Sequence, residues 1–131
     1  MPIELKILAL GALLLFIHIF IAVRFKTAQY GRQWNVSARD EALAPANPVT
    51  GRLIRAQANF EETFPIAIVA LLGVVIAGRT SEWTAIGGWI WLGARLVYVP
   101  LYWAGVPVVR TIVWTIGMVG LALVIWPLLV G

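Results

Sequence analysis

Three polar residues share one face of a helix that the sequence predicts at the start of a long apolar segment. Arg55, Asn59 and Glu62 are spaced at i, i+4 and i+7, so a helix with 3.6 residues per turn presents them in a row. Glu61 points to another side. A cation, an amide and an anion in one row could hold a small zwitterionic ligand, or could pair with neighbouring helices. Ionisable groups beside a long apolar segment need partners or a polar cavity.

A second group of candidates follows further along the chain. Arg95 lies in the middle of an apolar segment, and Tyr98 and Tyr102 follow it at i+3 and i+7, on the same helix face. Tyrosines near a span end usually form an interface belt, but their alignment with a buried arginine favours a site. Arg110 opens the last apolar segment, where an ordinary residue reaching the membrane surface would also fit. His18, inside the first segment, is expected to hydrogen-bond within the bundle rather than to relay protons.

The composition indicates a membrane protein. Of 131 residues, 61% are hydrophobic and 12% charged, whereas a soluble domain has about 45–50% and about 25%. The absence of cysteine excludes disulfides, thiolate metal sites and a protein thiol nucleophile. With a single histidine, we expect no metal site. The net charge of +4 does not indicate nucleic-acid binding, because most basic residues flank apolar segments and set topology.

The pattern predicts an all-α membrane protein with one domain, residues 1–131, built as a four-transmembrane-helix bundle. Each expected span has about 20 or more residues, enough to cross a hydrocarbon core of about 30 Å. Pro65 and Pro100 are expected to kink their helices. A long polar segment, rich in proline and arginine, is expected to form an irregular cytoplasmic cap. The expected spans are 5–23, 50–77, 83–103 and 110–129, and the expected cytoplasmic loop is 24–49.

The distribution of basic residues predicts the orientation. Five Lys and Arg residues follow the first span, over 24–52, whereas Arg79 alone follows the second. The positive-inside rule then places the long loop and the turn before Arg110 in the cytoplasm and both termini on the opposite side. We expect a bacterial inner membrane. This topology brings the following side chains to one level near the cytoplasmic face, with Arg95 and Tyr98 one to two turns deeper: Arg55, Asn59, Glu62, Tyr102 and Arg110.

Three segments together resemble the MAPEG family (membrane-associated proteins in eicosanoid and glutathione metabolism). Arg55-Ala-Gln-Ala-Asn59-Phe-Glu-Glu62-Thr-Phe-Pro65 resembles the signature of the second helix, and this motif is specific. Ala94-Arg95-Leu-Val-Tyr98-Val-Pro-Leu-Tyr102 is similar to the third helix, and Pro107-Val-Val-Arg110 to the start of the fourth. The resemblance covers nearly the whole chain. Thr63 departs from it, because some members have tyrosine there.

The resemblance implies a homotrimer that holds glutathione between adjacent subunits near the cytoplasmic face. It implies that Arg110 faces the glutathione sulfur as the catalytic residue. Gln57 matches a further ligand position, and Arg24 a basic position at the end of the first helix. The implied glutathione ligands are Arg24, Arg55, Gln57, Asn59, Glu62, Arg95, Tyr98 and Tyr102.

The leading hypothesis is a glutathione-dependent transferase that conjugates the glutathione thiolate to apolar electrophiles arriving from the lipid. A peroxidase would use the same thiolate. Lowering a thiol pKa of about 8.5 by two units needs about 2.7 kcal/mol, which one desolvated arginine can supply. The alternative is a non-enzymatic lipid- or partner-binding protein on the same scaffold. A small exporter fits least, because it would need a carboxylate deep in a span, and Glu61 and Glu62 lie near an end.

Overall fold

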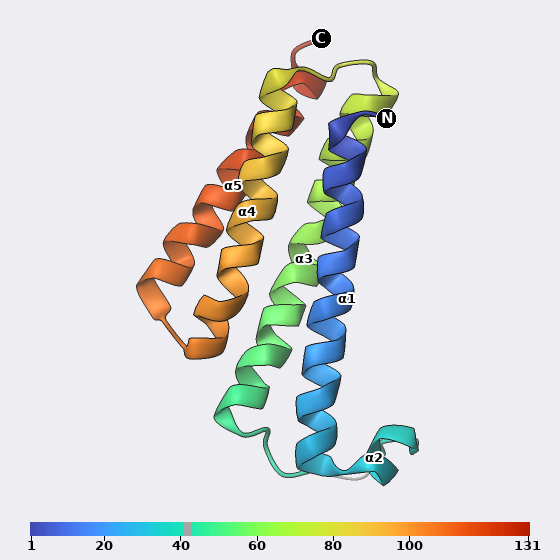
Figure 1. The fold of residues 1–131 in the computed structure, drawn as a ribbon, viewed down its shortest axis with the longest axis vertical. Coiled ribbons are helices and arrows are strands. Elements are labelled where there is room, and N and C mark those ends of the chain that lie inside the picture. The colour runs from blue at the N-terminus through green and yellow to red at the C-terminus, as the bar shows by residue number, and fades with distance from the viewer. Residues whose placement is uncertain (41–42) are drawn as a thin grey trace.

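The computed structural model describes residues 1–40 and 43–131, and these residues fold into four long helices and one short helix (Figure 1). The two chain ends lie at the same end of the bundle, and α2 lies at the other (Figure 1). This arrangement confirms the predicted all-α class. The helices are α1 (Ile3–Tyr30), α2 (Arg32–Val36), α3 (Pro48–Ile76), α4 (Glu82–Ala104) and α5 (Pro107–Leu129).

Local signals in the sequence set where three of the long helices begin. The Asn47 side chain caps α3 by accepting a hydrogen bond of 2.9 Å from the backbone N–H of Thr50. Ser81 and Thr84 form a reciprocal capping box at the start of α4. Pro107 occupies the first turn of α5, where its missing N–H costs nothing.

The segment expected to be an irregular loop is partly helical, which corrects the sequence interpretation. α1 continues beyond Val23 to Tyr30, and α2 occupies Arg32–Val36. The reason is that Arg24 and Lys26 end the apolar span without ending the helix, because arginine and lysine are good helix formers. The first residue that breaks the pattern is Gly31, with φ of 96°. Pro65 and Pro100, in contrast, lie inside helices that continue past them.

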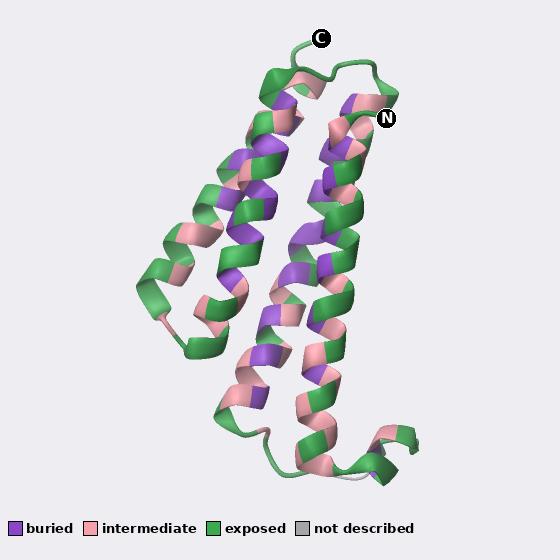
Figure 2. Ribbon diagram, viewed as in Figure 1, coloured by how far each residue is buried: buried purple, intermediate pink, exposed green. Residues whose placement is uncertain are grey.

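The core lies where α1, α3 and α4 face one another. Phe60, Phe64 and Trp91 pack ring against ring, with centroids 5.2–6.2 Å apart. The buried residues follow the inward faces of the helices (Figure 2). α4 and α5 approach closely at Gly87 and Gly120, where a Cβ on either glycine would come within 2.5–2.6 Å of the other's carbonyl oxygen. Such small residues let two helix backbones touch.

A buried carboxylate joins two helices near the chain termini. Glu4 of α1 is 2% exposed, and its Oε1 accepts a hydrogen bond of 2.5 Å from Oγ1 of Thr84 in α4. The same hydroxyl of Thr84 accepts a hydrogen bond from the Ser81 backbone within the capping box. Helix capping and the packing of α1 against α4 are therefore coupled through one side chain.

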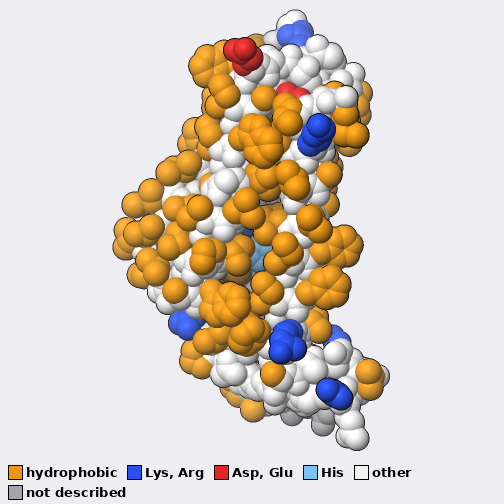
Figure 3. Space-filling model, viewed as in Figure 1, with side chains coloured by type: hydrophobic (Ala, Val, Ile, Leu, Met, Phe, Trp, Pro, Cys, Tyr) orange, Lys and Arg blue, Asp and Glu red, His pale blue; other side chains and the backbone are white. Residues whose placement is uncertain are grey.

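The distribution of polar and apolar side chains is that of an integral membrane protein. Large apolar side chains cover the visible outer surface, and the charged ones gather towards its two ends (Figure 3). Polar groups such as His18 and Arg95 are instead buried inside the bundle, as they are in membrane proteins. Three helices, α1, α3 and α5, are long and apolar enough to cross a membrane. α4 is not among them; its sequence contains tryptophans, tyrosines and an arginine.

Candidate functional site

A fully buried arginine stands at the centre of the site. Arg95 of α4 is 0% exposed, and its Nη1 donates a hydrogen bond of 2.8 Å to Oδ1 of Asn59 in α3. Its guanidinium carbon lies 5.1 Å from the ring centre of Phe60 and 4.4 Å from that of Tyr98. Its Nε and Nη2 have no hydrogen-bond partner in the described part of the chain. The aromatic rings therefore supply cation–π stabilisation where polar partners are missing.

A second arginine is oriented by the same group of tyrosines. Nη1 of Arg110, in the first turn of α5, donates a hydrogen bond of 3.3 Å to the hydroxyl of Tyr98. Its guanidinium carbon lies 4.7 Å from the ring centre of Tyr102. The two tyrosine rings pack edge to face, 5.4 Å apart. Tyr98 thus contacts both Arg95 and Arg110 and connects the deep cation to the shallow one.

Two hollows, each of about 230 Å³, meet at Arg110. The first, here called the arginine cavity, holds three guanidinium groups and no carboxylate among the described residues that line it. The second, the side cavity, continues from Arg110 along the first turns of α5. The arginine cavity is lined by Arg52, Arg55, Tyr102, Gly105, Pro107 and Arg110. The side cavity is lined by Asn59, Tyr98, Arg110, Thr111 and Trp114.

The turn between α4 and α5 shapes the arginine cavity. Gly105 ends α4 in the left-handed region, with φ of 74°, a conformation that glycine adopts without strain. A Cβ at this position would come within 2.7 Å of Nη1 of Arg52. Gly105 therefore serves both the turn and the approach of Arg52. Pro107 then starts α5 and places Arg110 in its first turn.

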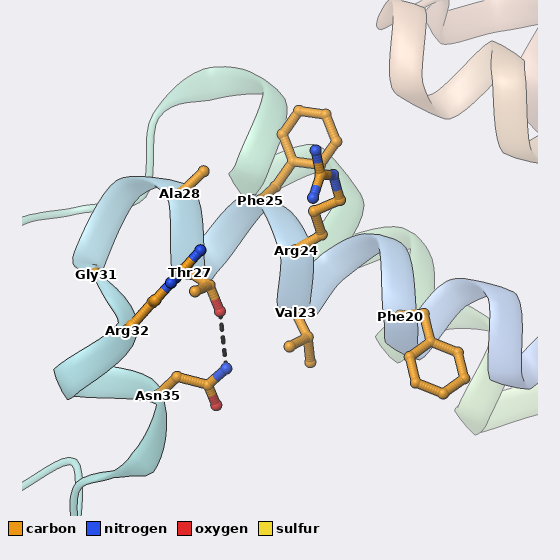
Figure 4. A pocket seen from close by; sticks show the side chains of 9 residues that line it. All are labelled: Phe20, Val23, Arg24, Phe25, Thr27, Ala28, Gly31, Arg32 and Asn35. Atoms are coloured by element: carbon orange, nitrogen blue, oxygen red, sulfur yellow. Dashed lines mark hydrogen bonds between the residues drawn. The ribbon is translucent and has the colours of Figure 1, made fainter.

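The structure brings together six of the nine residues predicted for the site. They are joined by the contacts and cavity linings described above: Arg55, Asn59, Arg95, Tyr98, Tyr102 and Arg110. The other three lie elsewhere within one protomer. Gln57 donates a hydrogen bond of 2.9 Å to Glu61, and Glu62 is exposed on α3. Arg24 lines a different hollow, at the end of α1 (Figure 4).

A comparison with known protein families shows which family the chain belongs to. The model of the MAPEG family matches residues 7–130 of the 131-residue chain. The chain belongs to the MAPEG family. This confirms the resemblance drawn from its second, third and fourth long helices. Searches among curated proteins and among solved structures gave no match.

This MAPEG chain also has lining residues that the sequence interpretation did not assign to the site. Arg52 precedes Arg55 by three residues on the same helix, and that spacing would have placed it in the predicted row. Thr111 and Trp114 follow Arg110 by one and four residues in α5. The position of Trp114 one turn after Arg110 is the signal that would have found it.

The electrostatics of the arginine cavity favour an anionic ligand. Three guanidinium groups that share one lining repel one another, and the repulsion grows as water is excluded. An arginine fork binds carboxylate or phosphate with two parallel hydrogen bonds, and such charge-assisted bonds are stronger than neutral ones. A ligand with two or more anionic groups would therefore be bound more tightly than one with a single charge.

Proposed function

We propose that this MAPEG protein is a glutathione transferase of the membrane, which joins the thiolate of glutathione to apolar electrophiles. The observation that carries the proposal is the arginine cavity, with Arg52, Arg55 and Arg110 in one lining and no carboxylate among its described members. Glutathione has two carboxylates and, when reactive, a thiolate. Its negative charges therefore match a lining in which three guanidinium groups have no carboxylate beside them among the described residues.

We assign each side chain of the site a role in glutathione binding according to its depth in the bundle. Arg52 and Arg55 bind the carboxylates of the tripeptide at the outer end. Arg110 faces the sulfur, since it lines both hollows and is oriented by Tyr98 and Tyr102. Arg95 stays deeper, where its hydrogen bond fixes Asn59 at the edge of the side cavity. Asn59 is thereby held in place to contact the ligand.

A homotrimer with glutathione between adjacent subunits is part of this proposal. Each hollow has about 230 Å³, less than the roughly 300 Å³ at which ligand pockets usually begin. A second wall, supplied by the adjacent subunit, would enlarge the site and close it. Arg55 and Glu62 are exposed on α3 of a single protomer, so both are accessible to a ligand held against this face. Glu62 would then receive the ammonium group of glutathione, and Gln57 would lie beside it.

We also propose that α4 crosses the membrane together with α1, α3 and α5, so that the chain has four spans. α4 and α5 each have 23 residues, which gives each a length of about 35 Å. The two helices lie antiparallel, side by side (Figure 1). With four spans, both termini lie on one side and the arginine cavity on the other, which the positive-inside rule makes the cytoplasm. The electrophile then reaches Arg110 from the lipid, past exposed apolar residues such as Val109 and Ile112.

The reaction needs a thiolate and a path for the proton. The glutathione thiol loses its proton to solvent as Arg110 stabilises the anion. The sulfur then attacks an electrophilic carbon, a carbon–sulfur bond forms, and the leaving group departs with the electron pair of the broken bond. Lowering the thiol pKa from about 8.5 to about 6.5 requires about 2.7 kcal/mol. A hydrogen-bonded guanidinium in a partly dry site supplies an interaction of this size.

The test is a conjugation assay with purified protein in detergent, glutathione and 1-chloro-2,4-dinitrobenzene. We expect conjugate formation, together with thiolate absorbance when glutathione alone is added. The Arg110→Ala variant should lose both signals and still bind the tripeptide. Arg79→Ala is the matched control, since Arg79 lies between α3 and α4 and donates to the carbonyl of Val130 near the chain end. Binding of an apolar ligand without thiolate formation in the wild-type protein would instead support a non-catalytic role.

A further inference from the structure

Two buried polar side chains pack against the same aromatic ring in the interior of one protomer. His18 of α1 is 4% exposed, and Arg95 of α4 is fully buried. The ring centre of Phe60 in α3 lies 5.1 Å from that of the imidazole and 5.1 Å from the guanidinium carbon of Arg95. α1, α3 and α4 thus each contribute one side chain to this group, which we call the His18–Phe60–Arg95 cluster.

Both polar members of the cluster have buried atoms without a hydrogen-bond partner among the described residues. These atoms are Nε2 of His18, and Nε and Nη2 of Arg95. The sequence predicts a hydrogen bond for His18 within the bundle, and no described residue supplies one to its Nε2. Buried polar groups of native proteins nearly always have a partner, either a protein atom or an ordered water. We therefore ask whether these three atoms are partners of one another.

The hydrogen-bonding chemistry of the three atoms is complementary. The nitrogens of arginine only donate, whereas one ring nitrogen of a neutral imidazole accepts. Among the buried unpaired side-chain atoms of the described residues, only Nε2 of His18 and Oγ1 of Thr50 can accept, because the others are nitrogens of tryptophan and arginine. Thr50 lies in the first turn of α3, about 15 Å along the helix axis from Phe60. His18 is therefore the acceptor available to Arg95.

The charges around His18 agree with this role. Arginine stays protonated in proteins, and a second positive charge on a buried imidazole beside it is unfavourable. Arg95 is the charged group that acts most strongly on His18, and Glu61 of α3 acts on it less. Glu61 is exposed and accepts a hydrogen bond from Gln57. A neutral His18 that accepts from the guanidinium would stabilise the buried cation without adding another charge.

We propose that His18 is a positioning residue of the glutathione site, whose Nε2 accepts from the guanidinium of Arg95 through one buried water. The two side chains make no direct hydrogen bond, and the 4% of the His18 surface that stays accessible allows a water to reach the ring. Arg95 is then held by His18 on one side and Asn59 on the other. Tyr98, which stacks on Arg95, transmits this order to Arg110. The inference rests on the proposed transferase function and extends it to a residue that lines neither hollow.

The first test is a double-mutant cycle read by glutathione conjugation. His18→Leu removes the acceptor and should lower kcat/KM by about tenfold. In the Arg95→Met background the same change should alter kcat/KM by less than about twofold, because the partner is already absent. His18→Gln places a carbonyl oxygen near the position of Nε2 and should restore kcat/KM to within about threefold of the wild type. If Arg95→Met is inactive, the same cycle is read from unfolding temperatures in detergent.

Two controls separate positioning from general stability and from the nearby carboxylate. Leu14→Ala changes a buried residue one turn before His18 on the same side of α1, so it should lower the unfolding temperature and leave kcat/KM unchanged. Glu61→Gln removes the other charge that acts on His18 and should also leave kcat/KM unchanged. A Glu61→Gln variant that reproduced the loss of His18→Leu would show that His18 acts through Glu61.

The second test does not depend on activity. His18 is the only histidine of the chain, so nitrogen NMR of protein with isotope-labelled histidine reports on this ring alone. We expect a neutral ring with an unprotonated Nε2, whose signal shifts in Arg95→Met. A protonated Nε2, a signal that Arg95→Met leaves unchanged, or equal losses from His18→Leu in both backgrounds would overturn the proposal. A wild-type protein that forms no conjugate would instead refute the transferase function, and the NMR signal would still decide whether His18 accepts from Arg95.

Discussion

Nη1 of Arg95 and Oδ1 of Asn59 are joined by a hydrogen bond of 2.8 Å that links α4 to α3 in the interior of the bundle. Arg95 is fully buried, whereas Asn59 also lines the side cavity with Arg110. One amide therefore partners a buried cation and forms a wall of the site. Through this bond, the stability of the bundle and the shape of the site depend on the same pair of residues.

Replacing Asn59 with leucine should destabilise the fold. The change removes the hydrogen-bond acceptor of Arg95, whose Nε and Nη2 already have no partner in the described residues. The expected cost is about 1–3 kcal/mol, which a thermal unfolding curve in detergent would measure. Gln57→Leu is the control, because it removes only an exposed hydrogen bond to Glu61 and should change stability by about 0.5 kcal/mol or less. Equal shifts in both variants would contradict the assigned role of Asn59.

Replacing Tyr98 with phenylalanine should slow turnover without weakening glutathione binding. The variant keeps the ring that stacks on Arg95 and loses the hydroxyl that orients Arg110. A hydrogen bond to a charged group contributes about 1.5–3 kcal/mol, and the length of 3.3 Å places this one at the lower end, so kcat should fall by about tenfold with KM unchanged. Steady-state kinetics with varied glutathione would measure this. Tyr30→Phe, which loses a hydroxyl bonded to the carbonyl of Ala44, should keep full activity. A raised KM with unchanged kcat would disprove the orienting role.

A methyl group at Gly120 should separate α4 from α5. An added Cβ would lie 2.6 Å from the carbonyl oxygen of Gly87 and 2.9 Å from the backbone N of Trp91, and backbone atoms cannot move aside locally. Gly120→Ala should therefore cost about 1–3 kcal/mol and lower the unfolding temperature. Gly93→Ala is the matched control, because nothing lies within 4 Å of its Cβ, and alanine favours a helix by about 0.5–1 kcal/mol. A lower unfolding temperature for Gly93→Ala than for Gly120→Ala would refute this packing.

The stability contributed by the buried contact between Glu4 and Thr84 should come from the threonine hydroxyl rather than from the shape of the side chain. Thr84→Val keeps the volume but leaves Glu4 without its donor and removes the acceptor for the Ser81 N–H. We expect a loss of about 1–3 kcal/mol in the free energy of unfolding, measured by denaturation in mixed micelles. Thr84→Ser retains the hydroxyl and should be nearly as stable as the wild type. If serine and valine were equally destabilising, packing of the methyl group would be the main contribution.

The sequence predicted the features that depend on local spacing. The helical row of Arg55 and Asn59, and that of Arg95 and Tyr98, follow from a fixed helix period, and the structure brings both rows together around Arg110. The end of α1 was misjudged because hydropathy indicates only where the apolar span ends, whereas the helix continues through a polar stretch to Tyr30, before Gly31. Arg52 was missed because, at the start of the expected second span, it was counted only among the basic residues that set the orientation.

Contacts between distant segments could not be predicted in this way. The hydrogen bond between Asn35 and Thr27 ties α2 to the last turns of α1, and it depends on how the chain turns at Gly31. Likewise, the bond between Glu4 and Thr84 connects residues 80 positions apart. Neither pair has a spacing signal, since the contact is made only after the helices have packed.

The central claim is that the arginine cavity is built to bind the carboxylates of glutathione. The most direct measurement is isothermal titration of the purified protein with glutathione and with its diethyl ester, which keeps the thiol and the amine but lacks both carboxylate charges. We predict saturable binding of glutathione, and affinity for the ester at least about tenfold lower, since a hydrogen bond to a charged group contributes about 1.5–3 kcal/mol. Arg55→Gln should reduce this difference. Equal affinity for the two compounds, or no saturable binding of glutathione, would contradict the account.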